Sequence, residues 1–226
     1  MTGTLWGIGI GPGDPELLTA KAIRLLGALP VLAWPAPLDG DGMARTIAAA
    51  YIPTDKIEIP IRLSFRPDRD DTDAAYGRAA ETIAAHLTAG RDVGILCEGD
   101  PLFFGSFIYV LNRLRDRFPV QVVPGISSPM AAAAVAVKPL SLLEDAVAII
   151  PATRSDDQIL ALLAPADSIV IMKVGRHLPR VKALLDRLGL LAGAVAVERA
   201  TWPEQRLLPL AEATELSYFS LILVHK

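Results

Sequence analysis

Short apolar runs alternate with longer amphipathic segments through the first half of the chain. The apolar runs, which predict strands, cover residues 4–10, 30–34, 56–61, 92–96 and 120–123. The segments between them predict helices over residues 16–26, 43–51, 73–89 and 104–118. Pro35 and Pro37 are expected to end the second strand, because proline donates no backbone hydrogen bond. The alternation is typical of a parallel sheet covered by helices.

The second half of the chain also alternates between the two kinds of element. An alanine-rich helix capped by Ser127 or Ser128 comes first, and its small side chains predict close packing against a neighbouring surface. Strands then follow over 146–150, 168–174, 194–197 and 216–224, with helices over 156–163 and 179–188. The predicted fold class is α/β: two α/β domains, residues 1–124 and 125–226, with a ligand cleft between them.

The amino-acid composition argues against several classes of function. The chain has 226 residues, 52% of them hydrophobic, which is enough for a sizeable core. Its net charge is −3 and it has no run of lysine or arginine, so a nucleic-acid partner is disfavoured. With no leader-like start and no apolar run of about 18 residues, we expect a cytoplasmic protein without a membrane partner. A single cysteine, Cys97, excludes an internal disulfide, and no residue cluster has metal-ligand spacing.

A Gly-Asp-Pro turn follows the strand predicted over residues 92–96. Gly99 ends the strand, and Asp100 followed by Pro101 predicts the N-cap and first residue of the next helix. In open α/β sheets, ligands bind at the carboxyl ends of the strands, where this turn lies. A ligand site and an ordinary capped turn are both compatible with the pattern.

The glycine-rich segment over residues 7–14 does not have the spacing of a dinucleotide-binding loop. Pro12 and Pro15 lack the N–H groups that a pyrophosphate requires, and Asp14 adds a negative charge. No carboxylate follows the second strand to bind a ribose. The segment better suits a zwitterion with an adenine and a cationic sulfur than a nicotinamide dinucleotide.

Other candidate residues have a structural interpretation beside the functional one. Met172, at the end of a predicted strand, is suited to contact a purine or to pack in the core. Ser127 and Ser128 lack a nucleophile elbow and a histidine partner, so a helix cap is favoured for Ser128. A polar segment over 198–206 follows the strand at 194–197. Arginines near the strand ends are natural receptors for carboxylates.

Three motifs together resemble the tetrapyrrole methylase family. The first is Gly9-Ile10-Gly11-Pro12-Gly13-Asp14, the second is Gly99-Asp100-Pro101, and the third is Val122-Val123-Pro124-Gly125-Ile126-Ser127-Ser128. They occur in the family's order and spacing. Further segments, such as Ile171-Met172-Lys173 and Glu198-Arg199-Ala200-Thr201, are similar to the subgroup that methylates C20 of precorrin-2 in cobalamin biosynthesis.

The resemblance implies S-adenosylmethionine as methyl donor, a reduced tetrapyrrole as substrate, and a homodimer. It places the donor site at the following matched positions: Pro12, Glu98, Gly99, Asp100, Phe103, Ser127, Ser128, Met172, Ala200 and Thr201. Because the substrate carries many carboxylates, Arg62, Arg199 and Arg206 are predicted to bind it. No residue is identified as a catalytic base.

The sequence also departs from its relatives at informative positions. Uroporphyrinogen methylases carry an acidic residue after the second strand and a lysine before the Gly-Asp-Pro turn, where this chain has Pro35 and Cys97. The departures argue against uroporphyrinogen as substrate. Phe104 replaces a tyrosine frequent in the C20 subgroup. A ribosomal-RNA ribose methyltransferase, a nicotinamide-dependent oxidoreductase and a non-catalytic donor-binding module remain as alternatives, and metal-free and cobalt-containing precorrin-2 are not distinguished.

Overall fold

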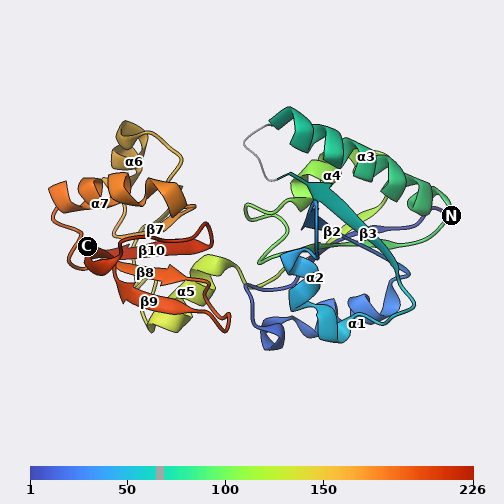
Figure 1. The fold of residues 1–226 in the computed structure, drawn as a ribbon, viewed down its shortest axis with the longest axis horizontal. Coiled ribbons are helices and arrows are strands. Elements are labelled where there is room, and N and C mark those ends of the chain that lie inside the picture. The colour runs from blue at the N-terminus through green and yellow to red at the C-terminus, as the bar shows by residue number, and fades with distance from the viewer. Residues whose placement is uncertain (65–68) are drawn as a thin grey trace. The chain divides into compact units, whose positions relative to one another are not determined.

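The computed structural model describes residues 1–64 and 69–226. The chain divides into two compact units, Met1–Ser127 and Ser128–Lys226, referred to below as the N-terminal and C-terminal units. Each is a sheet with helices on both faces (Figure 1). The division falls after residue 127, whereas the predicted domain boundary lies after residue 124. That these parts are two domains with a boundary after residue 124 stays a prediction.

The N-terminal unit is built on a five-stranded sheet in the order β3-β2-β4-β1-β5. Every pairing in it is parallel. The strands are β1 (Leu5–Gly9), β2 (Val31–Pro37), β3 (Ile57–Leu63), β4 (Val93–Cys97) and β5 (Val120–Val123). All five carboxyl ends therefore lie along one edge, with β4 and β1 side by side near the centre. This edge is where an open parallel sheet binds its ligands.

Helices cover both faces of this sheet (Figure 1). They are α1 (Ala20–Ala28), α2 (Met43–Ile47), α3 (Arg69–Thr88) and α4 (Phe107–Leu114), with short 3-10 turns at Pro15–Leu17 and Ala49–Tyr51. Alternate strand residues such as Val93 and Ile95 pack with α3 and α4 in one core cluster. Leu96 points to the opposite face and is also fully buried. Burial on both faces explains why β4 appears in the sequence as a continuous apolar run.

Several element boundaries in this unit differ from the predictions, and α1 begins at Ala20 rather than residue 16. β2 continues through both prolines to Pro37 instead of ending before them. Beyond Ala33 the strand pairs with β3 alone, so its proline nitrogens can face the unpaired side. α3 begins at Arg69 rather than residue 73. α4 begins at Phe107 rather than residue 104, because a turn occupies the intervening residues.

The C-terminal unit contains a mixed sheet in the order β6-β7-β10-β8-β9. Only β6 and β7 pair in parallel, and the remaining pairs are antiparallel. The strands are β6 (Val147–Pro151), β7 (Ser168–Met172), β8 (Val195–Glu198), β9 (Arg206–Pro209) and β10 (Ser220–His225). β9 was not predicted. It is a short edge strand of four residues, most of them exposed, and it includes a proline.

Helices cover both faces of this sheet as well (Figure 1). α6 (Asp156–Leu163) and α7 (Leu178–Arg187) contribute Ile159, Val181 and Leu185 to the core on one face. α5 (Ser128–Ala136) packs on the other face, where Ala131 and Ala132 contact residues of β7, β8 and β10. The surface against which the alanine-rich helix packs is therefore the sheet itself. 3-10 turns at Gly175–His177 and Leu210–Glu212 complete the unit.

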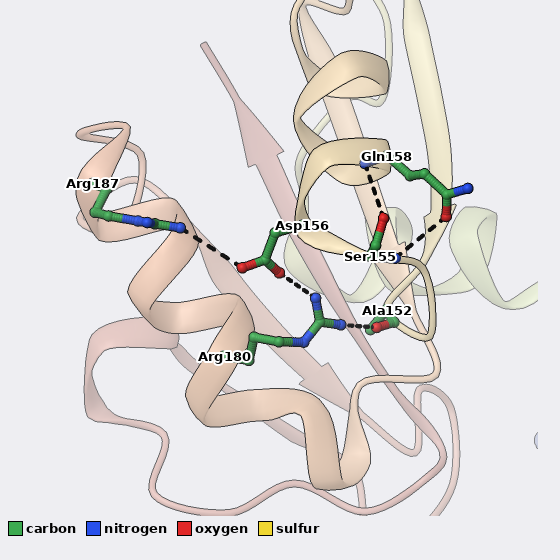
Figure 2. Close-up of polar contacts among 6 residues, drawn as sticks. All are labelled: Ala152, Ser155, Asp156, Gln158, Arg180 and Arg187. Atoms are coloured by element: carbon green, nitrogen blue, oxygen red, sulfur yellow. Dashed lines mark hydrogen bonds and ion pairs between the residues drawn. The ribbon is translucent and has the colours of Figure 1, made fainter.

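A polar cluster joins the start of α6 to α7 (Figure 2). Ser155 and Gln158 form a reciprocal capping box at the first turn of α6. Arg180 of α7 donates hydrogen bonds to the Asp156 carboxylate and to the carbonyl oxygen of Ala152. These contacts hold the β6–α6 turn on α7.

Candidate functional site

Glycine backbones meet at the carboxyl edge of the N-terminal sheet. The Gly99 N–H donates to the Gly11 carbonyl oxygen at 2.7 Å, and the Gly11 N–H donates to the Gly99 carbonyl oxygen at 3.4 Å. A Cβ on Gly125 would lie 2.1 Å from the Gly99 oxygen, and a Cβ on Gly9 would lie 2.5 Å from the Gly125 nitrogen. Side chains would therefore separate the ends of β1, β4 and β5. We refer to Gly9, Gly11, Gly99 and Gly125 as the glycine edge.

Asp100 connects this edge to the following turn. Its Oδ1 accepts the Leu102 N–H at 2.9 Å, and its Oδ2 accepts the Gly125 N–H at 3.1 Å. The prediction that Asp100 caps the next helix was wrong, because α4 begins only at Phe107. The carboxylate instead joins the turn after β4 to the segment after β5, which is 25 residues further along the chain. Both carboxylate oxygens therefore hold backbone N–H groups in place.

Glu98 follows β4 directly and its side chain remains exposed to solvent. Partial desolvation by the surrounding protein raises the pKa of its carboxyl, and a hydrogen bond from the Ala44 N–H opposes this rise without cancelling it. Ala44 lies in the first turn of α2. The Glu98 side chain is therefore directed to the α2 side of the sheet, opposite to the buried Cys97 thiol on the α3 and α4 side.

The other predicted donor-site residues of this unit follow the same strand ends. Pro12 lies after β1, Phe103 after β4 and Ser127 after β5, and each is half-buried. Phe103 packs edge-on against Phe104, with ring centroids 5.0 Å apart. The parallel sheet thus places them along the glycine edge. Their contact with a methyl donor stays a prediction.

The charges along this edge suit a cationic or zwitterionic ligand. Residues 9–14, 97–106 and 123–128 include the carboxylates of Asp14, Glu98 and Asp100 and contain no lysine or arginine. A phosphate ligand would need cations or a row of free N–H groups, and Pro12 and Pro101 remove two such groups. A sulfonium-bearing donor such as S-adenosylmethionine fits this set of residues.

In the C-terminal unit, the predicted residues lie at the ends of β7 and β8. Met172 ends β7 and packs, half-buried, against the cluster beneath α5, and its contact with a methyl donor stays a prediction. Ala200 is buried in the same cluster. Ser128 is the first residue of α5. Thr201 donates its N–H to Gln205 Oε1 at 2.7 Å.

Three residues with side chains have positive φ at the same two strand ends. Lys173 after β7 has φ 59°, and Arg199 and Thr201 after β8 have φ 46° and 71°. Residues with side chains rarely adopt such angles, least of all β-branched threonine. The Arg199 N–H donates to the Phe219 carbonyl oxygen at 2.8 Å, which holds the strained turn in place. Strain of this kind is typical of binding loops, and the residue sequence gave no signal of it.

Each of the three predicted substrate-binding arginines has a partner within its own unit. Arg62 Nη1 donates to the carbonyl oxygens of Pro37 and Gly40, at 2.9 and 2.5 Å. The Arg199 guanidinium lies 5.7 Å from the Phe219 ring centroid. Arg206 Nη1 lies 2.9 Å from Glu198 Oε2. These contacts orient the arginines, and their binding of substrate stays a prediction.

Glu198 is a buried carboxylate whose charge is compensated. Its Oε1 accepts the Ser217 N–H at 2.7 Å, and its Oε2 pairs with Arg206. Burial raises the pKa of Glu198, but the Ser217 hydrogen bonds and the Arg206 charge outweigh burial, so the pKa is lowered overall. The residue therefore anchors the end of β8 beneath the strained turn.

Two features are absent from the residues that the structure describes. Among residues 1–64 and 69–226, no helix is both long and apolar enough to span a membrane. In the same part of the chain, no cluster of three or more histidine, cysteine, aspartate or glutamate side chains could bind a metal ion.

The fold and this site define a class of protein. The family model for Tetrapyrrole (Corrin/Porphyrin) Methylases matches residues 4–214, so the chain belongs to that family. A precorrin-2 C(20)-methyltransferase from Sinorhizobium sp. is 41% identical, over 98% of this chain and 95% of the relative. A cobalt-precorrin-2 C(20)-methyltransferase from Salmonella typhimurium is 35% identical, over 100% of this chain and 98% of the relative.

A solved structure supports the same assignment. Uroporphyrin-III C-methyl transferase from Thermus thermophilus, complexed with S-adenyl homocysteine, is 26% identical, with a TM-score of 0.70. The match covers 99% of this chain and 98% of that one. The predicted family, the α/β fold class and the prediction of a methyltransferase are confirmed.

Proposed function

We propose that this protein transfers a methyl group from S-adenosylmethionine to C20 of precorrin-2, or of its cobalt form, in cobalamin biosynthesis. One observation carries the substrate assignment: the chain resembles two relatives named as C20 methyltransferases over nearly the whole length of each. Pro35 and Cys97 stand where uroporphyrinogen methylases carry an acidic residue and a lysine, which argues against uroporphyrinogen.

The glycine edge is the proposed donor site. When bound, S-adenosylmethionine supplies an electrophilic methyl group on a sulfonium sulfur. We assign its binding to the turns after β1, β4 and β5, including Pro12, Gly99, Phe103 and Ser127, with Asp100 holding the turns in register. In the C-terminal unit, Ser128, Met172, Ala200 and Thr201 are the proposed contributors. The acidic edge favours the positive charge of the donor.

The chain's task is to position the reactants. C20 of the reduced tetrapyrrole is electron-rich through the ring nitrogens, so it needs no activated nucleophile. Holding it in line with the methyl group is worth as much as ~7–11 kcal/mol in favourable cases. Excluding water strengthens electrostatic interactions with the sulfonium. Arg62, Arg199 and Arg206 are the proposed receptors for the substrate carboxylates. The Arg206 side chain is 53% exposed although it is paired with Glu198, so it remains accessible to a ligand.

We further propose a cytoplasmic homodimer that acts without a nucleic-acid or membrane partner. The net charge of −3 and the absence of basic runs support the exclusion of RNA. Sedimentation equilibrium tests the dimer: the expected mass is twice the 24.1 kDa of one chain. A mass of one chain at micromolar concentration would contradict it.

The function is tested by anaerobic incubation with isotope-labelled S-adenosylmethionine and precorrin-2, with and without cobalt, followed by mass spectrometry. The expected product carries one additional labelled methyl group, located at C20 by fragmentation or nuclear magnetic resonance. The faster substrate identifies the physiological form. If the donor binds and neither tetrapyrrole gains a methyl group, the substrate assignment fails while the donor site stands. Retention of RNA by the purified protein would instead favour a ribose methyltransferase.

A further inference from the structure

Methylation at C20 leaves a proton to be removed. The electron pair of C20 forms the new carbon–carbon bond, and the carbon–sulfur bond breaks with its pair on sulfur. The ring system is then one pair short, and C20 carries both a methyl group and its original hydrogen. Breaking the C20–H bond returns a pair to the ring and releases a proton. The sequence identified no group that accepts this proton.

Two of the carboxylates at the glycine edge accept hydrogen bonds from backbone N–H groups. Both oxygens of Asp100 accept N–H groups, from Leu102 and Gly125. Asp14 Oδ1 accepts the Glu16 N–H at 2.8 Å and caps the 3-10 turn after β1. Glu98 differs from both: it follows the central strand β4 and its side chain is exposed.

The Glu98 carboxylate lies on the α2 side of the sheet. The Ala44 N–H is close enough to it to lower its pKa. α2 is held in turn by close packing, since a Cβ on the preceding Gly42 would lie 2.0 Å from the Pro35 carbonyl oxygen. The neighbouring cation, Arg45, is engaged elsewhere: it pairs with Glu58 at 3.0 Å and lies over the Trp34 ring.

We propose that Glu98 is the general base that removes the C20 proton, an inference that rests on the proposed function. The Glu98–Asp100 backbone then belongs to the donor site, while the Glu98 side chain faces the reacting carbon. The proton passes from C20 to the carboxylate and afterwards to water.

The electrostatic surroundings suit this role. Desolvation raises the pKa of the Glu98 carboxyl, and a base is more effective when its pKa lies closer to the working pH. Cys97 on its own segment and Tyr76 on α3 are titratable groups that interact electrostatically with Glu98. Burial raises the pKa values of Cys97 and Tyr76 to about 12, so both stay neutral and neither competes for the proton.

The test is Glu98→Gln in the complete chain. The glutamine oxygen still accepts the Ala44 N–H, so the fold is retained, but the side chain accepts no proton. We expect the turnover rate with precorrin-2 to fall by about 100-fold or more. The affinity for S-adenosylhomocysteine, measured by calorimetry, should be unchanged. Substrate deuterated at C20 should react more slowly in the variant, because proton removal becomes rate-limiting.

A matched control separates charge loss from base loss. Glu81→Gln removes an exposed carboxylate on α3 that pairs with Arg117 at 3.2 Å, and it should leave the rate unchanged. The acidic limb of the wild-type pH–rate profile should disappear in Glu98→Gln and persist in the control. An unchanged rate in Glu98→Gln, or a loss of S-adenosylhomocysteine binding, would overturn the assignment as base. If the wild type methylates neither tetrapyrrole, the proposed function fails, and this inference with it.

Discussion

Asp100→Ala tests whether one carboxylate holds the glycine edge together. The substitution removes the acceptor of two backbone N–H groups, from Leu102 at 2.9 Å and Gly125 at 3.1 Å. Hydrogen bonds to charged groups contribute about 1.5–3 kcal/mol each. Leu102 is 52% exposed, so water replaces much of the first bond, whereas the Gly125 N–H is partly buried and loses its partner. We therefore expect the N-terminal unit to lose about 2–4 kcal/mol of stability.

The assay is urea unfolding followed by tryptophan fluorescence. Trp6 and Trp34 lie in the N-terminal unit and Trp202 in the C-terminal unit. In a Trp202→Phe background, the signal therefore reports the N-terminal unit alone. Asp100→Asn keeps one carbonyl oxygen as acceptor and should lose about half as much free energy as the alanine variant.

The control is Asp116→Ala, since this carboxylate is 91% exposed and lies 4.0 Å from Arg115. It should change the free energy of unfolding by less than about 0.5 kcal/mol. If Asp100→Ala were equally harmless, the carboxylate would not hold the strand ends. The variants that lose more stability should also bind S-adenosylhomocysteine more weakly, because the proposed donor site is built on this edge.

Further predictions concern other features of the two units. Gly125→Ala places a Cβ 2.1 Å from the Gly99 oxygen and should destabilise the protein by about 1–3 kcal/mol. Gly27→Ala lies at an open helical position and should stabilise the protein by about 0.5–1 kcal/mol. Urea unfolding measures both changes. The pKa of Glu198 is lowered by folding from its ordinary value of 4.5, so on acidification the unfolded chain takes up this proton before the folded protein does. The stabilising effect of the Glu198 carboxylate is therefore lost as the pH falls. In urea unfolding from neutral pH downward, Glu198→Gln should lose less stability than the wild type. Burial raises the pKa of Cys97 to about 12, so Ellman's reagent should modify it only after urea unfolding; rapid modification of the native protein would contradict this.

Local chemistry made most elements of the N-terminal unit predictable. Apolar runs that are largely buried indicated β1 and β4, and the Gly-Asp-Pro turn marked the end of β4. Where the prediction was wrong, a more distant contact decided the structure. β2 continues to Pro37 because β3 pairs with it beyond Ala33. Edge strand β9 was missed because it is only four residues long and contains a proline, and its pairing with β8 alone defines it.

Some features of the candidate site were likewise predictable from the sequence, and others were not. The sequence by itself determined which residues lie at strand ends, that the glycine-rich segments are acidic rather than basic, and which family the motifs match. Only the tertiary structure decided that Asp100 binds the Gly125 N–H rather than a helix end, that Glu198 pairs with Arg206, and that Glu98 is directed to α2. The physical reason is the distance along the chain over which each interaction acts. Turn preferences and hydrophobic period depend on neighbours along the chain, whereas strand order and the partner of a carboxylate depend on which distant segments the fold brings together.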